Sequence, residues 1–480
     1  MKKSTIATGV IIAFGAIWTG GAWYTGKIIE QQYQQQISKI YQTWLQENQV
    51  LGAITQIEDV QIERGIFSSD FHYKINIKSD NLTLDLPFDG TLYHGPLPLN
   101  QVAKLNIMPA MFSLSAKLAN NQDLAKLLQT NNNESPISLV ATMSYSQNIH
   151  GEETFIPAQL TTDDVQINWD KGVIKFDLPL QGMGNYDVDF DKINVTLTGD
   201  ALKKFVAETS ANQLKKMTIE LDNLKSNSDI KSTELPFLYT GNWKASVDNL
   251  HYTYSYTDVP TETFDLAKLE MSVDAKQDKD VMNYAVALKT EPKLNEKSFG
   301  EFEFTFNADH LLAKTVSAIL ATDPNDDAEM QRLSLELLQN QPHLRINPLN
   351  LTNNAGKIVA DLDVELLEKD FSKAFKGKIL SLFKQLSLNI NVDKSAITEL
   401  LSTQEQATGQ DKTTADAQAQ QQMEMLVEQG KAQEIIIEKD NKVSLNLKLE
   451  KEGINFNGNI IPEEYIGMAI LGMMMQGVEH

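Results

Sequence analysis

Cysteine is absent from the 480-residue chain, and arginine occurs only at Arg64, Arg332 and Arg345. Without cysteine the protein has no disulfide, no cysteine-ligated zinc and no thiol nucleophile. An oxidising compartment remains compatible, because larger domains fold without disulfides. The scarcity of arginine and the net charge of −22 both disfavour a surface for phosphates or nucleic acids. We therefore expect no nucleic-acid partner.

The usual signatures of catalysis are missing as well. The sequence contains no GxSxG elbow, no Walker loop and no GxGxxG phosphate turn. Its seven histidines lack the HxH or HxxxH spacing of a zinc site. Adjacent carboxylates such as Asp163 and Asp164 would point to opposite faces of a strand, which separates them for acid–base work. We predict no catalytic residue, no metal site and no cofactor, and we expect a protein that is not an enzyme.

Two short segments nevertheless attract attention. In "RGIFSS", Ser68 and Ser69 follow Gly65 in a predicted hairpin rather than in a strand-to-helix elbow, which argues against a serine nucleophile. In "HGPLPL", the prolines impose an extended path that ends a sheet. His94 at its start could titrate near neutral pH or cap a loop, and we favour the loop.

The N-terminus begins with two lysines and continues with an uncharged apolar run over residues 6–24. A run of roughly 20 residues is long enough to span a bilayer. It could be a signal peptide cleaved after the small residues at 20–22, or an uncleaved anchor. Trp18 and Trp23 resemble an interfacial aromatic belt, which favours the anchor. We predict a transmembrane helix over residues 1–26, with its lysines on the cytoplasmic side.

A second helix is predicted over residues 27–48. Tyr33, Ile37, Ile40 and Trp44 fall on one helical stripe. The stripe could pack on its own domain or pair two chains as a short coiled coil. Small residues in the anchor have the spacing that packs two membrane helices together. A homodimer formed through the anchor and the juxtamembrane helix is the partner that these patterns indicate, beside the membrane itself.

The rest of the chain alternates apolar and polar residues around turns that contain glycine. Such patterns occur over residues 58–77, 165–178, 349–364 and 445–456, with the glycines Gly65, Gly172, Gly356 and Gly453. Glycine supplies the positive φ that tight turns demand, so we predict hairpins at these places. One apolar face and one polar face are typical of antiparallel sheet.

Helices are predicted at intervals between the strands. Alternating segments run into Asp200, Asp309 and Asp393, which we expect to be helix N-caps. We predict an α+β fold in which a transmembrane helix precedes large antiparallel sheets with short interspersed helices. Its regions would be a β-rich part over 49–300 and an α+β part over 301–480. The Gln/Ala-rich segment at 402–422 would be a flexible linker or an exposed helix.

These pieces resemble the YdgA-like family of Gram-negative envelope proteins, which contain a domain of unknown function. The motifs that carry the resemblance are "WTGGAWYTGK" from Trp18, "RGIFSS" from Arg64, "HGPLPL" from His94, "LNIMPA" from Leu105, "GINFNG" from Gly453 and "EEYIGM" from Glu463. The resemblance implies an anchor in the bacterial inner membrane, crossed once, with the bulk of the chain in the periplasm. It implies no catalytic residue.

Two classes of function follow. The first is a non-enzymatic, membrane-anchored periplasmic protein, either a scaffold or a module that handles lipid. The second is an envelope hydrolase with an unrecognised active site. The first agrees with the repeated strands and the missing site motifs. Strands such as the one with Phe302, Phe304 and Phe306 offer one apolar face, which must be buried against a second sheet, a helix or a ligand. A lipid acyl chain is one candidate, and an ordinary sandwich of two sheets is the other.

Overall fold

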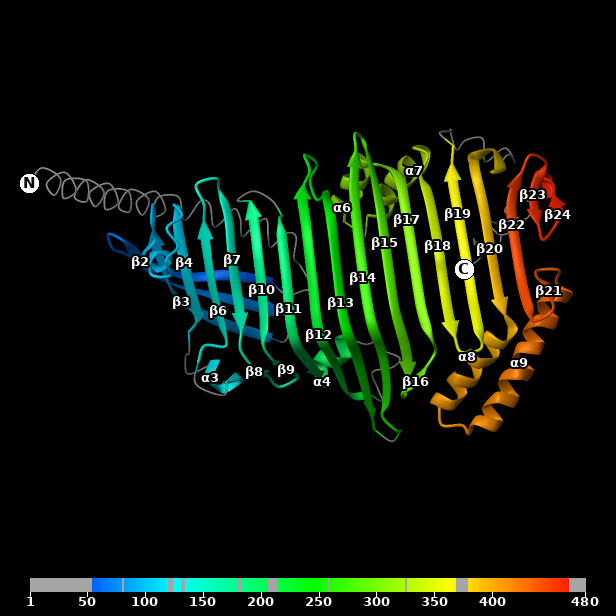
Figure 1. Cartoon of the computed structure of the whole chain (residues 1–480), viewed down its shortest axis with the longest axis horizontal. Coiled ribbons are helices and arrows are strands. Elements are labelled where there is room, and N and C mark those ends of the chain that lie inside the picture. The colour runs from blue at the N-terminus through cyan, green and yellow to red at the C-terminus, as the bar shows by residue number, and fades with distance from the viewer. Residues whose placement is uncertain are drawn as a thin grey trace, which may run out of the picture. The chain divides into compact units, whose positions relative to one another are not determined.

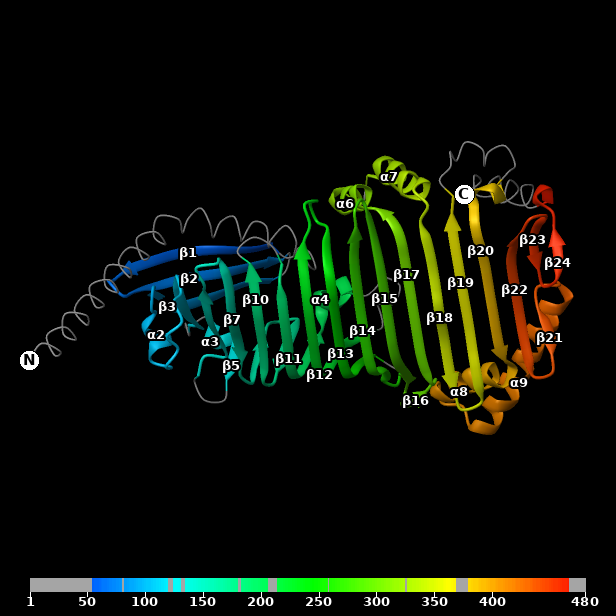
Figure 2. The same ribbon diagram turned by 45° about the horizontal axis from the view of Figure 1, so that its top comes forward.

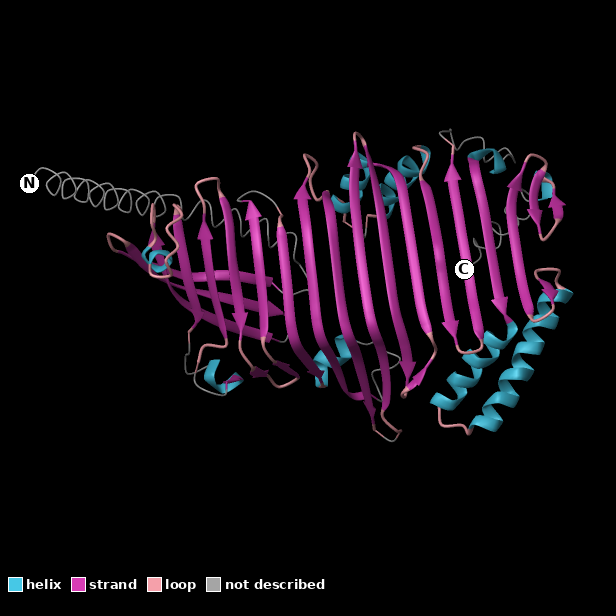
Figure 3. Cartoon of the chain, in the orientation of Figure 1, coloured by secondary structure: helices cyan, strands magenta, loops and turns pink. Residues whose placement is uncertain are grey.

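The computed structural model describes residues 54–79, 82–119, 124–130, 134–179, 183–205, 214–257, 259–323, 326–367 and 379–465. Strands make up 59% of these residues and helices 21%. Figure 3 shows long strands throughout, with helices only in the connections between them. The expected α+β class is therefore corrected to a mainly antiparallel β structure. The reason is that alternation with period two fills the chain, whereas helical stripes are short and few.

The fold class also included an N-terminal transmembrane helix, and this part is corrected too. No helix in the described part of the chain is long and apolar enough to cross a membrane. The segments predicted as anchor and juxtamembrane helix, 1–26 and 27–48, lie outside the described residues, and so does the dimer contact predicted through them.

The chain divides into two compact units, residues 1–229 with 254–260 and residues 230–253 with 261–480. The first unit contains, in order, β1 (Ile54–Arg64), β2 (Ser68–Ser79), β3 (Leu82–His94), α2 (Leu99–Val102), β4 (Phe112–Leu118), α3 (Leu124–Leu127), β5 (Leu128–Thr130), β6 (Ile137–Met143), β7 (Asn148–Phe155), β8 (Ala158–Thr161), β9 (Val165–Trp169), β10 (Gly172–Pro179), β11 (Asn185–Leu197) and α4 (Gly199–Phe205). Strands β12 (Leu214–Ser232) and β13 (Tyr239–Tyr256) each have residues in both units.

The longer strands of the first unit pair antiparallel with one another in chain order. Pairing runs from β1 through β2, β3, β4, β6, β7, β10 and β11 to β12. The short strands β5, β8 and β9 extend this ladder, because β9 pairs with the second half of β11 and β8 joins β9 to β5. Most connections are local, but the chain between β7 and β10 passes through β8 and β9, which pair elsewhere.

The second unit contains β14 (Glu262–Asp278), β15 (Val281–Leu294), β16 (Lys297–Ser298), β17 (Glu301–Leu312), α6 (Ala313–Ala321), α7 (Asp327–Gln339), β18 (His343–Asn353), β19 (Gly356–Leu366), the 3₁₀ turn Ile379–Leu382, β20 (Phe383–Asp393), α8 (Lys394–Ala407), α9 (Lys412–Ala432), β21 (Ile437–Lys439), β22 (Lys442–Glu450), β23 (Gly453–Phe456) and β24 (Asn459–Ile461). Its long strands again pair in chain order, from β14 through β15, β17, β18, β19, β20, β22 and β23 to β24.

Helices of the second unit lie at the two ends of its strands. Figures 1 and 2 show α6 and α7 at one end and α8 and α9 at the other. Helices α8 and α9 occupy the Gln/Ala-rich segment, which is therefore helical rather than a flexible linker. In α9 the side chains of Ala415, Ala419, Met423 and Val427 recur every fourth residue and are buried.

The hairpin predictions are correct in three places and wrong in one. β1 pairs with β2, β18 with β19 and β22 with β23. β9 and β10, however, do not pair with each other. Both lie antiparallel to β11, so the chain passes straight through Asp170 and Lys171 instead of turning. Gly172 accordingly has no positive φ, whereas Gly453 has a φ of 151°.

Two of the three predicted N-caps are wrong, and the third holds the cap position without the expected side-chain hydrogen bond. Asp309 lies within β17 and forms an ion pair with Arg345. Asp200 lies inside α4, where its backbone N–H donates to Asp164 Oδ2 at 3.0 Å. Asp393 is the N-cap residue of α8, as predicted, but its carboxylate accepts from the backbone N–H of Lys357 instead of from the helix. Strand ends and helix starts coincide at these places, so an aspartate has cross-strand partners that compete with the cap.

Candidate functional site: the apolar face of the second unit

One face of the second unit's sheet is apolar across its strands. On β17, Phe302, Phe304 and Phe306 alternate with charged and polar residues, so the aromatic rings share one side of the strand. Residues paired directly across an antiparallel ladder point to the same face. Phe304 pairs with Leu288 on one side and with Leu349 on the other, which continues the apolar row in both directions.

The register carries this face from β14 to β23. Its members are half-buried and uncharged: Val273, Val286, Leu288, Phe302, Phe304, Phe306, Leu344, Ile346, Leu349, Leu351, Ile358, Ala360, Leu362, Val364, Leu386, Leu388, Ile390, Leu445, Leu447 and Phe456. Within the described residues, the long strands of this unit pair with their neighbours in one antiparallel ladder. The side chains of the apolar face keep part of their surface accessible to solvent.

Ion pairs occupy the opposite face. Lys289 Nζ lies 3.0 Å from Glu303 Oε1 across β15 and β17, and Arg345 pairs with Asp309 across β18 and β17. Charged side chains that bridge neighbouring strands keep this side in water at little energetic cost, since exposed pairs are worth at most about 1 kcal/mol each. The polarity of the two faces thus fixes which one is available to an apolar ligand.

Helices bury the apolar face at its ends. Near one end, Met282 and Ala313 are 0% and 1% exposed, because α6 packs over β15 together with Leu238. Near the other end, Val443 packs against Met423 and Val427 of α9. Between these clusters the side chains of Phe304, Leu349 and their neighbours are only half-buried. The uncovered middle of the face is the candidate site for an apolar ligand.

A second arrangement brings together the two motifs of the first unit. His94, at the end of β3, donates from Nδ1 to the carbonyl oxygen of Ile66 at 3.0 Å. This bond leaves Nε2 as an acceptor, and Ser69 Oγ lies 2.8 Å from it. The backbone N–H of His94 also donates to Phe67 O at 2.8 Å. The "RGIFSS" turn and the "HGPLPL" segment are therefore joined through one histidine, a contact that sequence reasoning missed.

The Ser69–His94 pair has the atoms of a nucleophile and its base but lacks access. Ser69 is 7% exposed and His94 1% exposed. Burial lowers the pKa of His94, so its imidazole is held neutral. A Cβ at Gly95 would meet Ala110 O at 1.9 Å, which shows how tightly the segment is packed. A substrate has no room beside this pair. The hydrogen bonds of His94 agree instead with the prediction that this residue caps a loop.

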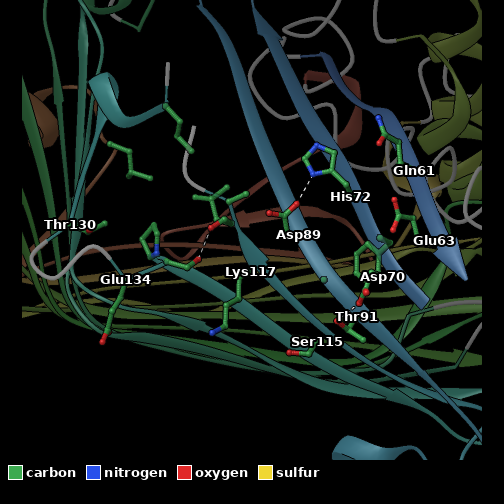
Figure 4. Close-up of a pocket in the computed structure, with 18 of the residues that line it drawn as sticks. Gln61, Glu63, Asp70, His72, Asp89, Thr91, Ser115, Lys117, Thr130 and Glu134 are labelled. Atoms are coloured by element: carbon green, nitrogen blue, oxygen red, sulfur yellow. Dashed lines mark hydrogen bonds and ion pairs between the residues drawn. The ribbon is translucent and has the colours of Figure 1, made fainter. Parts of the chain in front are cut away.

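A polar cavity of about 710 Å³ lies nearby on the first unit. Figure 4 shows His72 and Asp89 pointing toward one another in it, with Nδ1 and Oδ1 2.6 Å apart. Thr91 Oγ1 donates to Asp70 Oδ1 at 2.8 Å. In the part of the chain that the structure describes, no hydrogen bond joins the His72–Asp89 pair to a hydroxyl, and no acidic or histidine cluster is arranged to hold a metal. The cavity therefore has cross-strand polar pairs without a catalytic constellation.

Comparison with known proteins shows which family the chain belongs to. The family model "Bacterial protein of unknown function (DUF945)" matches residues 1–464. The protein YdgA of Escherichia coli is 25% identical over 98% of this chain and 97% of its own length, and YihF of the same organism is 22% identical over 97% and 98%. An uncharacterized Haemophilus influenzae protein is 31% identical over 52% of this chain, and the match covers 65% of that protein. No solved structure matches. The resemblance inferred from the motifs is confirmed, and the chain belongs to the DUF945 family of bacterial proteins.

Proposed function

We propose that this protein is a non-enzymatic component of the Gram-negative cell envelope that holds lipid acyl chains on the apolar face of β14 to β23. The single observation behind the proposal is the uncharged, half-buried face that continues from strand to strand, with helices packed on it at its ends. A location at the inner membrane with most of the chain in the periplasm belongs to the same proposal and rests on the family resemblance.

The dimensions of the face suit an acyl chain. Neighbouring strands lie about 4.8 Å apart, so the face from β14 to β23 extends on the order of 30 Å across the strands. One leaflet of a bilayer supplies half of a hydrocarbon core that is about 30 Å thick. A whole acyl chain therefore fits on the face. Each methylene that it buries contributes about 0.8 kcal/mol, so contact over several methylenes supports binding.

The chemistry of the face argues against a polar ligand. A sugar, peptide or nucleotide would leave its hydrogen-bonding groups unsatisfied against Phe304, Leu349 and Leu388, which costs about 1–3 kcal/mol for each buried group. A hydrolase is not favoured by any arrangement described above, since Ser69 and His94 are buried and the His72–Asp89 pair has no nucleophile beside it.

Site-specific crosslinking in cells tests the proposal. A photoreactive phenylalanine analogue is placed at Phe304, and in a second variant at Glu303, the next residue on the same strand but on the ion-paired face. After irradiation the protein is purified and the adducts are identified by mass spectrometry. We expect lipid adducts at position 304 at several times the yield at position 303.

Other outcomes would reject lipid handling. Equal lipid adducts at both positions would indicate non-specific contact with membrane. Adducts to protein alone at position 304 would indicate a scaffold. No adduct at either position, in a variant that melts at the wild-type temperature, would leave the face without a ligand.

A further inference from the structure

A short loop of the first unit presents apolar side chains to solvent. Leu105 is 90% exposed, Met108 74% and Ile107 72%. We call residues 105–108 the apolar loop. It follows α2, in which the side chain of Leu99 is also exposed, at 39%. The loop coincides with the "LNIMPA" motif, for which the acyl-binding face of the other unit gives no role. Isolated exposed apolar residues are ordinary, but a cluster this exposed indicates an interaction site.

The backbone of the apolar loop is held in place. Leu105 N donates to Val102 O and Asn106 N to Gln101 O, both at 2.9 Å. The Asn106 side chain donates to Gln101 Oε1 at 3.1 Å and accepts from Met108 N at 3.2 Å. The loop is thus tied to α2 by backbone and side-chain bonds at the same time.

The same network reaches the sheet below. Gln101 Nε2 donates to Ser113 Oγ at 3.0 Å on β4 and to Thr142 Oγ1 at 3.1 Å on β6. Ser113 is fully buried, so the network anchors the loop in the interior of the unit. A loop fixed in this way loses little conformational entropy when its apolar side chains bind a partner and leave water.

Leu105 adopts a φ of 62°, in the left-handed region that a branched, non-glycine residue rarely occupies. Strain of this kind persists where the surrounding structure enforces it, and it is concentrated at functional positions. The chain is held on both sides of Leu105, by α2 before it and by Ala110 after it, whose backbone N–H donates to Pro96 O at 2.9 Å.

The charge around the apolar loop differs from that of the whole protein. The chain carries −22 overall, yet no aspartate or glutamate occurs between Asp89 and Asp123, and Lys104 and Lys117 lie in that interval. Lys104 is exposed directly beside Leu105. Apolar side chains that adjoin a lysine, in a segment of the sequence without acidic residues, suit the surface of an anionic membrane.

We propose that the apolar loop inserts Leu105, Ile107 and Met108 into the surface of a phospholipid bilayer. A stable protein interface uses roughly 20–30 residues on each side, many more than the loop offers. A bilayer needs no matching pocket, and a few inserted side chains give a weak, reversible attachment. The proposal is independent of acyl binding by the second unit, because it concerns different residues and a different readout.

The absence of cysteine makes a local test straightforward. The full chain is prepared with Ile107→Cys, or with Asp163→Cys as the control at another exposed position of the same unit, and each is labelled with an environment-sensitive fluorophore. The labelled proteins are mixed with vesicles of phosphatidylethanolamine and phosphatidylglycerol that contain acyl-chain nitroxide lipid. We expect quenching by the nitroxide at position 107 that is several-fold stronger than at position 163, with protection from aqueous iodide at position 107 only.

Matched variants then separate the loop from general hydrophobicity. Leu105→Ser with Met108→Ser should abolish most of the nitroxide quenching at position 107. Leu320→Ser with Met425→Ser, which removes two apolar side chains that are 55% and 60% exposed in the second unit, should leave it unchanged. Equal quenching at positions 107 and 163 would overturn the proposal. Protection of position 107 from iodide without vesicles would overturn it too, in favour of contact with another protein chain.

Discussion

Gly172 offers a sharp test of how the first unit is packed. A Cβ built on Gly172 would lie 2.2 Å from Cε1 and 2.3 Å from Cδ1 of Phe190, which faces it across β10 and β11. Phe190 is 8% exposed and its ring centroid lies 5.0 Å from that of Phe155. The ring therefore has little freedom to move aside when Gly172→Ala adds a methyl group.

Two effects of this substitution oppose each other. Forcing a methyl group into a packed core costs about 1–3 kcal/mol. Replacing glycine where φ is not positive also restricts the unfolded chain, which stabilises the folded state by about 0.4–1 kcal/mol. The clash at 2.2 Å is far below ordinary contact, so the cost exceeds the gain. We expect a net loss of about 1–2 kcal/mol in the free energy of unfolding.

Urea unfolding of four proteins measures the effect: wild type, Gly172→Ala, Phe190→Leu and the double variant. The smaller, flexible leucine makes room for the added methyl group. Gly172→Ala should therefore cost about 1 kcal/mol less in the Phe190→Leu background, a coupling of the size found for residues in contact. The same cost in both backgrounds would refute the clash as its cause.

Two further predictions concern buried titratable groups. Burial lowers the pKa of His94 below its usual 6.5, so the unfolded chain binds a proton at this residue in a range where the folded protein does not. The free energy of unfolding of the wild type should therefore be constant with respect to His94 above pH 6.5 and decrease below it. His94→Gln should be less stable at neutral pH but should not show this decrease. Parallel curves of stability against pH for the two proteins would contradict the lowered pKa of His94. Burial raises the pKa of Glu153, which lies between Leu139 and Ile174 in the register. Above its folded pKa the charged carboxylate destabilises the folded protein. Glu153→Gln should therefore raise the free energy of unfolding at neutral pH by on the order of 1 kcal/mol, and this gain should vanish once the pH is well below 4.5. Thermal melts at both pH values check this, and an equal effect at both would be inconsistent with a titrating cause.

Sequence periodicity predicted the strands and most of the hairpins because both depend on local information. Alternation around Gly65, Gly356 and Gly453 indicated paired strands, and the structure pairs them. The same pattern around Gly172 was misleading, since a glycine can serve a turn or make room for a neighbouring ring. Phe190, the ring in question, is distant in sequence, so nothing near Gly172 distinguishes the two roles.

The helix caps failed for a related reason. Aspartate was expected to cap at positions 200, 309 and 393, yet the carboxylates that accept from helix N–H groups belong to Asp326 and Asp411, at 3.1 Å each from the N–H of Glu329 and Thr414. Both real caps stand in connections between helices, where no strand competes for the side chain. Cross-strand partners such as Arg345 for Asp309 depend on register, which a single sequence specifies only weakly.

The candidate site was foreseeable only in part. Alternation shows that a strand has an apolar face. The sequence pattern does not differ, however, between a face covered by a second sheet, by a helix or by a ligand. The covering layer depends on the whole topology. A meander with local connections, as in β14 to β23, places each strand beside its predecessor and sends none back across the face. The loop with Leu105 was visible as a motif, whereas its exposure required the structure.

Charge then distinguishes among the occupants that could cover the apolar face. A second copy of the chain would bring another net charge of −22 to the contact, and the repulsion opposes association of two such faces. A neutral acyl chain meets no such barrier, but an anionic headgroup carried into the same field does. The face should therefore accept lipids with zwitterionic headgroups in preference to anionic ones. The adducts at Phe304 report this preference directly when the headgroup composition of the crosslinked lipid is compared with that of the whole membrane. An excess of anionic lipid among the adducts would mean that local cations, and not the net charge, decide which lipid binds.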